Sequence, residues 1–582
     1  MKRRVVSLLI ALVFALTCFG AYASGEETKP YGTLHMYTTA EITNLNPHEN
    51  MDADAEDLVK GTLLKPYAEI PTEDGSTSHY VPELAAELPI PQNDEQTEWI
   101  IPIRQGLTWE NGDKITAHDF VYSMKMALDP KLLTSRGASV AADYITIVNA
   151  EKYMSQASSG EAVDFSEVGI QEVDEYTVKI ICETYAEQID VIRQLGRKWA
   201  TIVNEKLYEA CMSEDRTSCS YGTSLDKWMS CGAFILTDFQ PGVSYTMKRN
   251  ENYVFPDLIK IEAYNMVVVK DANTALELFL NGELDQVSLS AAAKEQYEDD
   301  PRILEAPAST VNTISINRLN PDHNGLLGNL NFRKAMFYGV DRITIAKMVK
   351  GIPANYILGQ KVLGNVETGE KYRDLAGAQE YLSENCGYDP VLAKEYYDKA
   401  MAEVGLTEVT LEIIYNESSA NYRTTAEYLE QSLPKIFGDG FSIKLNPMEK
   451  NLAKTQRKQW QKGVLNCFDF SIGSWDTSSL APWNAMKVYC AWYSNRTDPI
   501  FDDTYDALWE EANNTRKAKE DLAYRLDLVF QMEKIALDDV FVVPLYEVPS
   551  FSLVSERVNL PFDHYVPGYG RGYMYSSITE GN

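Results

Sequence analysis

Residues 103–123 of the chain read IRQGLTWENGDKITAHDFVYS and contain several separate structural signals. The apolar, β-branched run at residues 99–104 leads into this stretch and predicts a strand. Pro102 favours an edge position for that strand, because proline cannot donate a hydrogen bond to a neighbouring strand. Asn111 and Gly112 predict a tight hairpin turn, since both residues accept a positive φ. We therefore expect a strand and then a turn before residue 116.

The second part of the same stretch predicts a capped helix. Thr116 can accept a hydrogen bond from a backbone N–H in the first turn while Asp119 reaches back to the N–H of Thr116, which is the reciprocal arrangement of a capping box. The helix should end at Asp129-Pro130, because proline disfavours helical backbone in the residue before it. Its predicted apolar face consists of Phe120, Met124, Ala127 and Leu128.

A second alternation of helix and strand follows late in the chain. Asp389-Pro390 supplies an N-cap and a first-turn proline, and Gly405 is a natural C-terminal cap for the same helix. Residues 410–415 predict a strand, and residues 423–433 predict a helix that stops at Pro434. Strands and helices that alternate on this scale imply α/β layers.

Length and charge limit the class of protein. The 582 residues suggest two or three domains, since a single hydrophobic core rarely grows so large. The formal net charge is −32, which opposes binding to nucleic acid and to anionic lipid surfaces. After the N-terminal segment no apolar run reaches about 18 residues, so we expect no membrane-spanning helix in the mature protein.

Residues 1–23 have the three parts of a secretory signal peptide. Lys2-Arg3-Arg4 forms the basic region, residues 5–19 form the apolar region, and Ala21-Tyr22-Ala23 fits the cleavage site. The sequence therefore predicts export to the periplasm or the cell surface. A second possibility is lipid anchoring through Cys18, but the residues before Cys18 fit a lipobox poorly, which favours cleavage after Ala23.

Seven cysteines remain after that cleavage, and none forms a C-x-x-C pair. Cys211, Cys219 and Cys231 lie close together in the sequence and allow one local disulfide in an oxidising compartment. The alternative is that all seven are buried thiols.

Local motifs for catalysis or metal binding are missing from the sequence. There is no H-E-x-x-H pattern, no nucleophile elbow and no phosphate-binding loop, so we predict no enzyme, no metal and no cofactor. Ser224 and Lys227 match S-x-x-K, but the companion motifs are absent. Paired carboxylates of a glycosidase would leave no local pattern, so a secreted hydrolase stays the least favoured alternative. The 35 tyrosines suit a pocket that holds organic ligands, or the cores of a large protein.

Several segments together resemble one protein family. Residues 81–85 and 103–123 are similar to the signature of the extracellular solute-binding proteins that bind oligopeptides, dipeptides or nickel, which runs approximately L-R-x-G-v-x-W-s-D-G-x-x-v-T-A-x-D-F-V-y-S. Further similar segments follow in the family's order over nearly the whole mature chain, at residues 45–48, 231–234, 249–253, 280–285, 331–342, 473–475 and 543–546.

The resemblance implies an α/β protein of the type II periplasmic-binding-protein class, with two hinged lobes and an inserted third lobe. The first lobe would comprise residues 30–66, 191–308 and 542–582. The inserted lobe would comprise residues 67–190, and the distal lobe residues 309–541. The implied function is the substrate-binding component of an ABC importer, which captures an oligopeptide between closing lobes and delivers it, as a monomer, to a membrane permease.

The resemblance also implies which residues bind the ligand. The run Glu41, Ile42, Thr43 and Asn44 would pair with the ligand backbone as an added strand. The run Trp475, Asp476, Thr477 and Ser478 would line the opposite wall, unless Trp475 and Asp476 only pack between lobes.

The sequence departs from the family at a decisive position. Peptide-binding members carry an aspartate three residues after the tryptophan, which pairs with the ligand ammonium, and the equivalent here is Ser478; Ile472 stands where some members have arginine. Asp476 or Glu41 would have to replace the missing charge. The alternatives are therefore a ligand of another kind (an oligosaccharide, a modified peptide or a metal chelate) or a role in ligand sensing.

Overall fold

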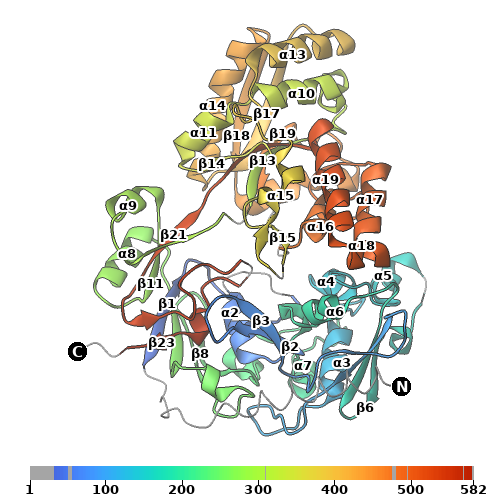
Figure 1. Cartoon of the computed structure of the whole chain (residues 1–582), viewed down its shortest axis with the longest axis vertical. Coiled ribbons are helices and arrows are strands. Elements are labelled where there is room, and N and C mark those ends of the chain that lie inside the picture. Colours follow the sequence, from blue (N-terminus) through green and yellow to red (C-terminus); the bar gives the residue numbers. More distant parts are fainter. Residues whose placement is uncertain are drawn as a thin grey trace.

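The computed structural model describes residues 32–49, 55–160, 162–308, 310–366, 368–474, 480–493, 496–567 and 569–579. It has a broad lower half built mainly from the N-terminal part of the chain and an upper half built from the later part (Figure 1). Within these ranges no helix combines the length and the apolar character needed to cross a membrane. The predicted signal peptide at residues 1–23, with Cys18, lies outside the described residues.

The lower half contains a four-stranded sheet in the order β1-β10-β9-β8. Its strands are β1 (Thr33–Thr38), β10 (Ala263–Val268), β9 (Ser244–Arg249) and β8 (Phe234–Gln240). β1 runs parallel to β10, although the two strands are far apart in the sequence. The other two pairs of the sheet are antiparallel. Alternate residues of β1, including Leu34 and Met36, are buried, which fixes the face that β1 turns to the core.

A second four-stranded sheet of the lower half lies at its side, in the order β4-β5-β7-β6. Its strands are β4 (Ile90–Pro91), β5 (Glu98–Pro102), β7 (Thr177–Ile181) and β6 (Ile170–Asp174). The edge position predicted from Pro102 is wrong, because β5 pairs with strands on both sides. Pro102 is tolerated because β4 is only two residues long and pairs with Trp99 and Ile100, so its pairing ends before the proline.

The predicted turn and capped helix are present beside this sheet. Gly112 has φ +88°, and the N–H of Gly112 donates to the carbonyl of Trp109. Helix α3 (Ala117–Ala127) starts with the reciprocal capping box of Thr116 and Asp119. The other oxygen of the Asp119 carboxylate accepts the indole N–H of Trp109 at 3.0 Å. One carboxylate therefore joins the strand–turn segment to the helix.

The upper half is built on a six-stranded sheet in the order β14-β20-β13-β19-β17-β18. The strands are β14 (Ile352–Pro353), β20 (Val542–Glu547), β13 (Val311–Ile316), β19 (Phe470–Ser474), β17 (Val409–Asn416) and β18 (Phe441–Met448). The helices that pack on it include α10 (Leu330–Gly339), α13 (Pro390–Val404) and α14 (Ala420–Phe437). Figure 1 shows a separate group of helices beside this sheet, which includes α17 (Asp503–Asn514) and α19 (Leu522–Asp538).

Two predicted boundaries in the upper half have different outcomes. The carboxylate of Asp389 caps α13, and Gly405 ends it with φ +72°, as the sequence predicts. The predicted stop of the next helix at Pro434 is wrong, because α14 continues to Phe437. The extra turn buries Phe437 against the ring of Tyr397, with 4.5 Å between ring centroids. Burial of a phenylalanine contributes about 1.5–3 kcal/mol, which offsets the cost of a proline near a helix end.

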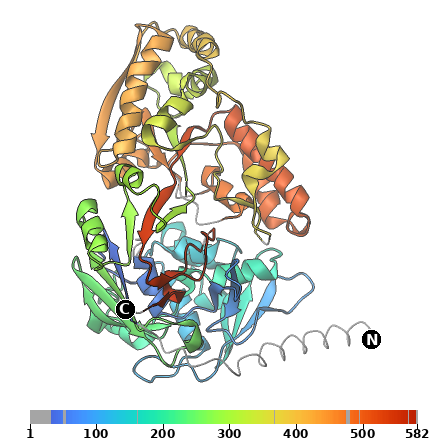
Figure 2. The same cartoon turned by 60° about the vertical axis from the view of Figure 1, so that its left-hand side comes forward.

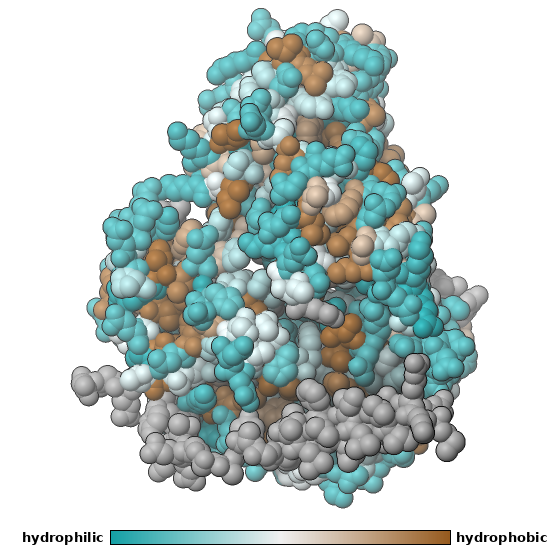
Figure 3. Space-filling view, in the orientation of Figure 1, coloured by the Kyte–Doolittle hydropathy of each residue, from teal (hydrophilic) through white to brown (hydrophobic). Residues whose placement is uncertain are grey.

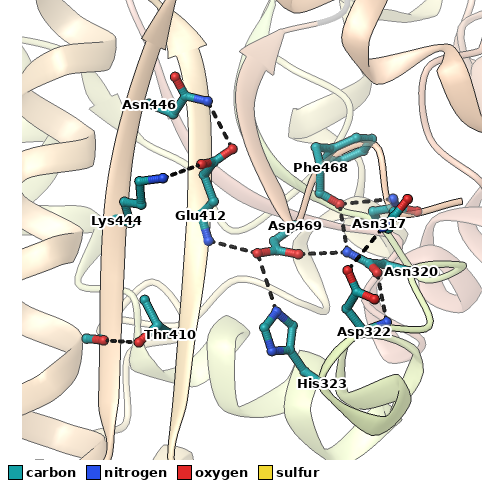
Figure 4. Close-up of polar contacts among 12 residues, drawn as sticks. Asn317, Asn320, Asp322, His323, Thr410, Glu412, Lys444, Asn446, Phe468 and Asp469 are labelled. Carbon is teal, nitrogen blue, oxygen red and sulfur yellow. Dashed lines mark hydrogen bonds and ion pairs between the residues drawn. The ribbon is translucent and has the colours of Figure 1, made fainter. Parts of the chain in front are cut away.

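A polar network holds β17 and β19 together beyond their short pairing (Figure 4). The carboxylate of Asp469 accepts the backbone N–H of Glu412 at 2.8 Å and the side-chain amide of Asn320 at 2.7 Å. Lys444 and Asn446 on β18 donate to the carboxylate of Glu412. Side chains thus tie the three strands at one end of the sheet.

The chain crosses between the halves twice. It leaves the lower half after β12 (Ile303–Ala306) and enters β13, and it returns from β20 to β21 (Ser550–Val554). β21 lies between β12 and β11 (Gln286–Leu289) in a small sheet of the lower half. Figure 2 shows β21, in red, running between the two halves. β20 pairs within the upper sheet, and β21 is the next strand of the lower half along the chain.

All seven cysteines within the described residues are thiols. The local disulfide allowed for Cys211, Cys219 and Cys231 is therefore absent. The alternative that all seven are buried thiols is correct except for Cys211, which is half-buried. Cys219 donates to the carbonyl of Tyr208 at 3.6 Å, and the Cys231 sulfur accepts the N–H of Leu64 at 3.4 Å. Burial raises the pKa of both thiols above the usual value, which keeps them protonated and unreactive.

Candidate functional site

A cavity of about 810 Å³ lies between the two halves, next to the crossing strands. Its walls come from three parts of the fold: the lower half, a short helical segment of the upper half at residues 484–493, and the C-terminal segment at residues 565–575. Strands β12 and β21 also contribute to the wall. In the view of Figure 3, hydrophilic residues cover most of the surface and hydrophobic residues form separate patches. A volume of this size suits an organic ligand.

One wall of the cavity is charged and internally paired. Glu56 on α2 (Glu56–Thr62) contacts Lys60 at 2.5 Å and Lys198 at 2.7 Å. Burial raises the pKa of Glu56, but the two ammonium groups outweigh it and lower the pKa to about 2. This carboxylate is therefore ionised and already satisfied, and it does not need a ligand cation.

Glu83 is the most deeply buried carboxylate of the same cavity, with 3% of its surface exposed. It accepts the hydroxyl of Tyr253 at 2.6 Å and the backbone N–H of Lys65 at 3.2 Å. Burial raises the pKa of Glu83 above its usual value, and Lys65 opposes that change only in part. The group is held by neutral donors rather than by a direct ion pair.

The C-terminal segment covers the cavity with aromatic side chains. Tyr569, Tyr573 and Tyr575 belong to it, and Phe551 of β21 lies in the same wall. The rings of Tyr569 and Tyr575 are stacked, with 6.3 Å between centroids. Rigid aromatic surfaces bind apolar side chains of many shapes, because they offer area with few directional requirements.

The upper half closes the cavity with the short helix α16 (Pro482–Ala485) and the turn η9 (Met486–Tyr489). The ammonium of Lys487 pairs with the carboxylate of Asp143. Asp143 belongs to the part of the lower half that contains the sheet of β4, β5, β7 and β6. Burial lowers the pKa of Lys487, but the carboxylate of Asp143 outweighs it and the net shift is upward. The ion pair therefore joins the two halves at the wall of the cavity.

A second contact between the halves lies farther along the same interface. Lys519 on α18 (Arg516–Glu520) donates to the carbonyl of Tyr185 at 2.9 Å and lies 3.6 Å from the carboxylate of Asp190. The side chains of Lys519 and Asp190 are only 3% and 6% exposed. Arg516 places its guanidinium 5.1 Å from the ring centroid of Tyr185. The upper half is therefore docked on the lower half by buried polar contacts.

The first run of predicted ligand-binding residues lies away from this cavity. Ile42 is 1% exposed, and its carbonyl accepts the hydroxyl of Tyr245 at 2.8 Å. Glu41 is exposed and pairs with Lys270, Thr43 is exposed, and Asn44 donates to Glu49 at 3.2 Å. None of the four lines the large cavity. Their role in binding stays a prediction.

The second predicted run, Trp475, Asp476, Thr477 and Ser478, lies outside the described residues. Ser474, which precedes it, is the last residue of β19 and lines a smaller cavity of about 40 Å³. Ala485 and Val488 line both cavities, so the smaller one adjoins the larger one. Ile472 is buried in the upper core.

Sequence reasoning did not identify the residues that line the large cavity. Lys487, Asn484 and Arg136 belong to no recognisable motif, and their positions depend on how the two halves meet. The C-terminal tyrosines did leave a signal, because residues 565–575 contain four tyrosines and three glycines, described here except for Gly568. Tyrosines grouped in this way suit a ligand pocket, because their rings are apolar and their hydroxyls are polar.

Comparisons with known proteins agree on one family. Residues 79–496 match the model of "Bacterial extracellular solute-binding proteins, family 5 Middle". The chain is 25% identical to the dipeptide-binding protein of Lactococcus lactis subsp. cremoris, with 72% of each chain covered. It is 24% identical to the oligopeptide-binding protein OppA of Bacillus subtilis over the full length of both.

The solved structures support the same fold. The structure described as Listeria monocytogenes OppA bound to peptide matches with a TM-score of 0.72 and 23% identity, over 96% of this chain and 100% of that one. This likeness confirms the expected α/β fold of the type II periplasmic-binding-protein class.

Proposed function

The chain belongs to the bacterial extracellular solute-binding proteins of family 5, and from this premise we propose that it captures oligopeptides in the cavity between its two halves and delivers them to an ABC importer. The observation that carries the proposal is the cavity of about 810 Å³ beside two strand crossings. Two crossings form a hinge, and a ligand that contacts both halves favours the closed state.

Peptide is the ligand class that the wall chemistry fits best. The wall offers tyrosine rings for variable side chains, and polar atoms of Arg136, Trp199 and Asn484 without partners among the described residues for polar groups. The relatives named above bind dipeptides or oligopeptides, according to their names. Backbone pairing by Glu41–Asn44 and wall contacts by Trp475–Ser478 remain part of the proposal.

We also propose the division into three lobes, with the distal lobe extended to include β20. The sheet of β4, β5, β7 and β6 supports an inserted lobe within residues 67–190. The upper sheet supports a distal lobe that ends at Glu547. The permease would dock on the closed form as the chain's membrane partner, and the chain itself would act as a monomer.

A ligand other than a free peptide is the second candidate. Ser478 occupies the position where peptide-binding members carry an aspartate, so the ligand ammonium lacks that partner. An unpaired buried charge costs several kcal/mol, which favours ligands without a free amine. An oligosaccharide, a modified peptide or a metal chelate would meet this requirement.

Export to the periplasm or the cell surface accompanies the proposal, since the family is extracellular. Cleavage after Ala23 would release the protein, whereas processing at Cys18 would anchor it to lipid. Intact-mass analysis of the protein from both the released and the membrane fraction distinguishes the two, because lipid attachment adds mass to an N-terminal cysteine.

Native mass spectrometry of the purified protein, followed by denaturation, tests the ligand class. Released peptides of mixed sequence would support the peptide proposal, and a single non-peptide species would favour the second candidate. Addition of a peptide mixture should also raise the melting temperature, because a ligand that binds only the folded state stabilises it by mass action. No shift with any peptide mixture would count against peptide binding.

A further inference from the structure

Three polar side chains of the large cavity have buried nitrogen or oxygen atoms that no described residue of the protein hydrogen-bonds. Asn484 is 3% exposed, and both its carboxamide nitrogen and its carboxamide oxygen have no hydrogen-bond partner among the described residues. The indole nitrogen of Trp199, which is 4% exposed, has none there either, and neither has the Nε of Arg136. A buried polar group without a partner costs about 1–3 kcal/mol, so such groups call for an explanation.

Arg136 and Trp199 form one unit on the lower half. The guanidinium of Arg136, which directly precedes α4 (Gly137–Ala141), lies 5.7 Å from the ring centroid of Trp199. Trp199 lies in the turn η3 (Lys198–Ala200), and the guanidinium of Arg197 is 5.9 Å from the same ring. A guanidinium over an aromatic ring keeps its N–H groups able to donate, and the Nε of Arg136 has no hydrogen-bond partner among the described residues.

The two carboxylates whose charges act on Arg136 also pair with lysines, and one oxygen of Asp143 is left without a hydrogen-bond partner among the described residues. Burial lowers the pKa of Arg136, while the charges of Glu56 and Asp143 oppose that shift, so both carboxylates act on it. Glu56 is paired with Lys60 and Lys198, and Asp143 is paired with Lys487. Arg136 is therefore a cation whose neighbouring anions are shared with lysines.

Asn484 lines the same cavity from the upper half. It lies three residues before Lys487 on consecutive helical turns, so the two side chains share a face. Because Lys487 pairs with Asp143, that face is turned toward the segment that contains Arg136. All of these residues line the same cavity.

We propose that Arg136, Trp199 and Asn484 form a subsite for a ligand carboxylate next to an amide group. Arg136 and the indole of Trp199 only donate hydrogen bonds, which matches a carboxylate. Asn484 both donates and accepts, which matches the N–H and C=O of a peptide bond. The C-terminal residue of a peptide carries a carboxylate next to a peptide bond. An Asp or Glu residue within a peptide also carries a carboxylate close to its own peptide bonds. The inference rests on the proposed peptide function and adds that residues from both halves, among them Arg136 of the inserted part, select the ligand.

Peptide libraries test the subsite in the full mature protein. The first probe is a random pentapeptide library without Asp or Glu, with free C-terminal carboxylates, and the second is the same library amidated at the C-terminus. The third is an amidated library that carries Glu at one position. Each is incubated with unliganded protein and the bound fraction is measured by native mass spectrometry. We expect the first library to bind at least about tenfold more tightly than the second.

Substitutions then assign the preference to residues. In R136Q the ratio between the first and second libraries should fall to near one. In the control R104Q the ratio should be kept, because Arg104 also stacks on an aromatic ring, Phe255 at 6.0 Å, but does not line the cavity. N484L should weaken binding of both libraries without lowering the melting temperature, since Asn484 makes no hydrogen bond that folding would lose.

The outcomes separate the subsite from the proposed function. Equal binding of the first two libraries would overturn the subsite and leave peptide binding intact. Failure of every library to bind to folded protein would overturn both. If the third library binds as tightly as the first and loses that affinity in R136Q, the subsite stands and accepts a side-chain carboxylate. If the third library behaves as the second, the subsite stands and selects the C-terminus.

Discussion

The ammonium of Lys487 in the upper half pairs with the carboxylate of Asp143 in the lower half, and both side chains are largely buried, at 20% and 6% exposed. The second oxygen of Asp143 is buried without a hydrogen-bond partner among the described residues. The pair therefore joins two bodies that the hinge allows to separate. It stabilises the closed arrangement at the same place where the cavity lies.

Removal of the lysine should open the protein. In K487M the carboxylate of Asp143 loses its counter-ion, and a buried charge without a partner costs several kcal/mol unless water reaches it. Opening of the two halves admits water and relieves this cost. We expect a larger radius of gyration for unliganded K487M in small-angle X-ray scattering, and a ligand affinity reduced by roughly tenfold or more.

The control for this change is K534M. Lys534 forms an exposed pair with Asp538 at 3.1 Å within α19, and exposed pairs contribute little. K534M should leave both the radius and the affinity unchanged. The double mutant K487M/D143N removes the uncompensated charge of Asp143 and is measured beside K487M. An unchanged radius of gyration in K487M would show that the ion pair does not govern closure.

Glu56 predicts a pH-dependent contribution to stability. Its folded pKa of about 2 lies below the ordinary value of 4.5, because the two paired lysines outweigh the effect of burial. A carboxyl with a depressed folded pKa stabilises the folded state above its unfolded pKa and loses that contribution as the pH falls through the folded pKa. The contribution is at most about 3 kcal/mol.

Chemical denaturation of the wild type and E56Q measures this effect. The difference in unfolding free energy should be largest near neutral pH and should shrink between about pH 5 and about pH 2. The matched control is E251Q, since Glu251 is 73% exposed and lies 3.5 Å from Arg249. A difference for E56Q that does not change over this range would contradict the assigned ion pairs.

The sequence predicted the fold better than the site, and the residues show why. The capping box of Thr116 and Asp119 and the caps of Asp389 and Gly405 depend on interactions within a few residues, so the sequence alone specifies them. Pro434 misled the prediction because its helix is extended by a tertiary contact, the packing of Phe437 on Tyr397.

The cavity depends on contacts that no local pattern records. Lys487 and Asp143 are far apart in the sequence and meet only when the two halves close. The family resemblance placed the ligand at Glu41–Asn44 and Trp475–Ser478, and it carried no information on Arg136, Trp199 or Asn484. Unpartnered buried atoms are visible only once the side chains are packed.

Asp469 should be important for stability and not for binding. Its carboxylate accepts hydrogen bonds from the N–H of Glu412 and from Asn320, and D469A leaves both donors without that acceptor. We expect a loss of about 1–3 kcal/mol in urea denaturation, because buried donors lose their partner. D398A, which removes an exposed pair with Lys394, should cost less than about 0.5 kcal/mol. If D469A kept the unfolding free energy of the wild type but bound ligand more weakly, this role would be contradicted.

Asp119 lies within the stretch that most resembles the family signature, and the structure gives it an architectural role. Its carboxylate accepts the N–H of Thr116 at 2.8 Å and the indole N–H of Trp109 at 3.0 Å, so it caps α3 and fixes the preceding turn at once. D119A should lower the unfolding free energy by about 1–3 kcal/mol, since a cap and a buried indole lose their acceptor. D119N keeps one carboxamide oxygen as an acceptor and should lose less unfolding free energy.

Denaturant unfolding gives the stability of both variants, and the same samples give their affinity for a peptide mixture. Because Asp119 does not line the large cavity, we expect that affinity to be unchanged while the protein remains folded. Loss of affinity in D119N at wild-type stability would instead assign this signature residue to ligand recognition.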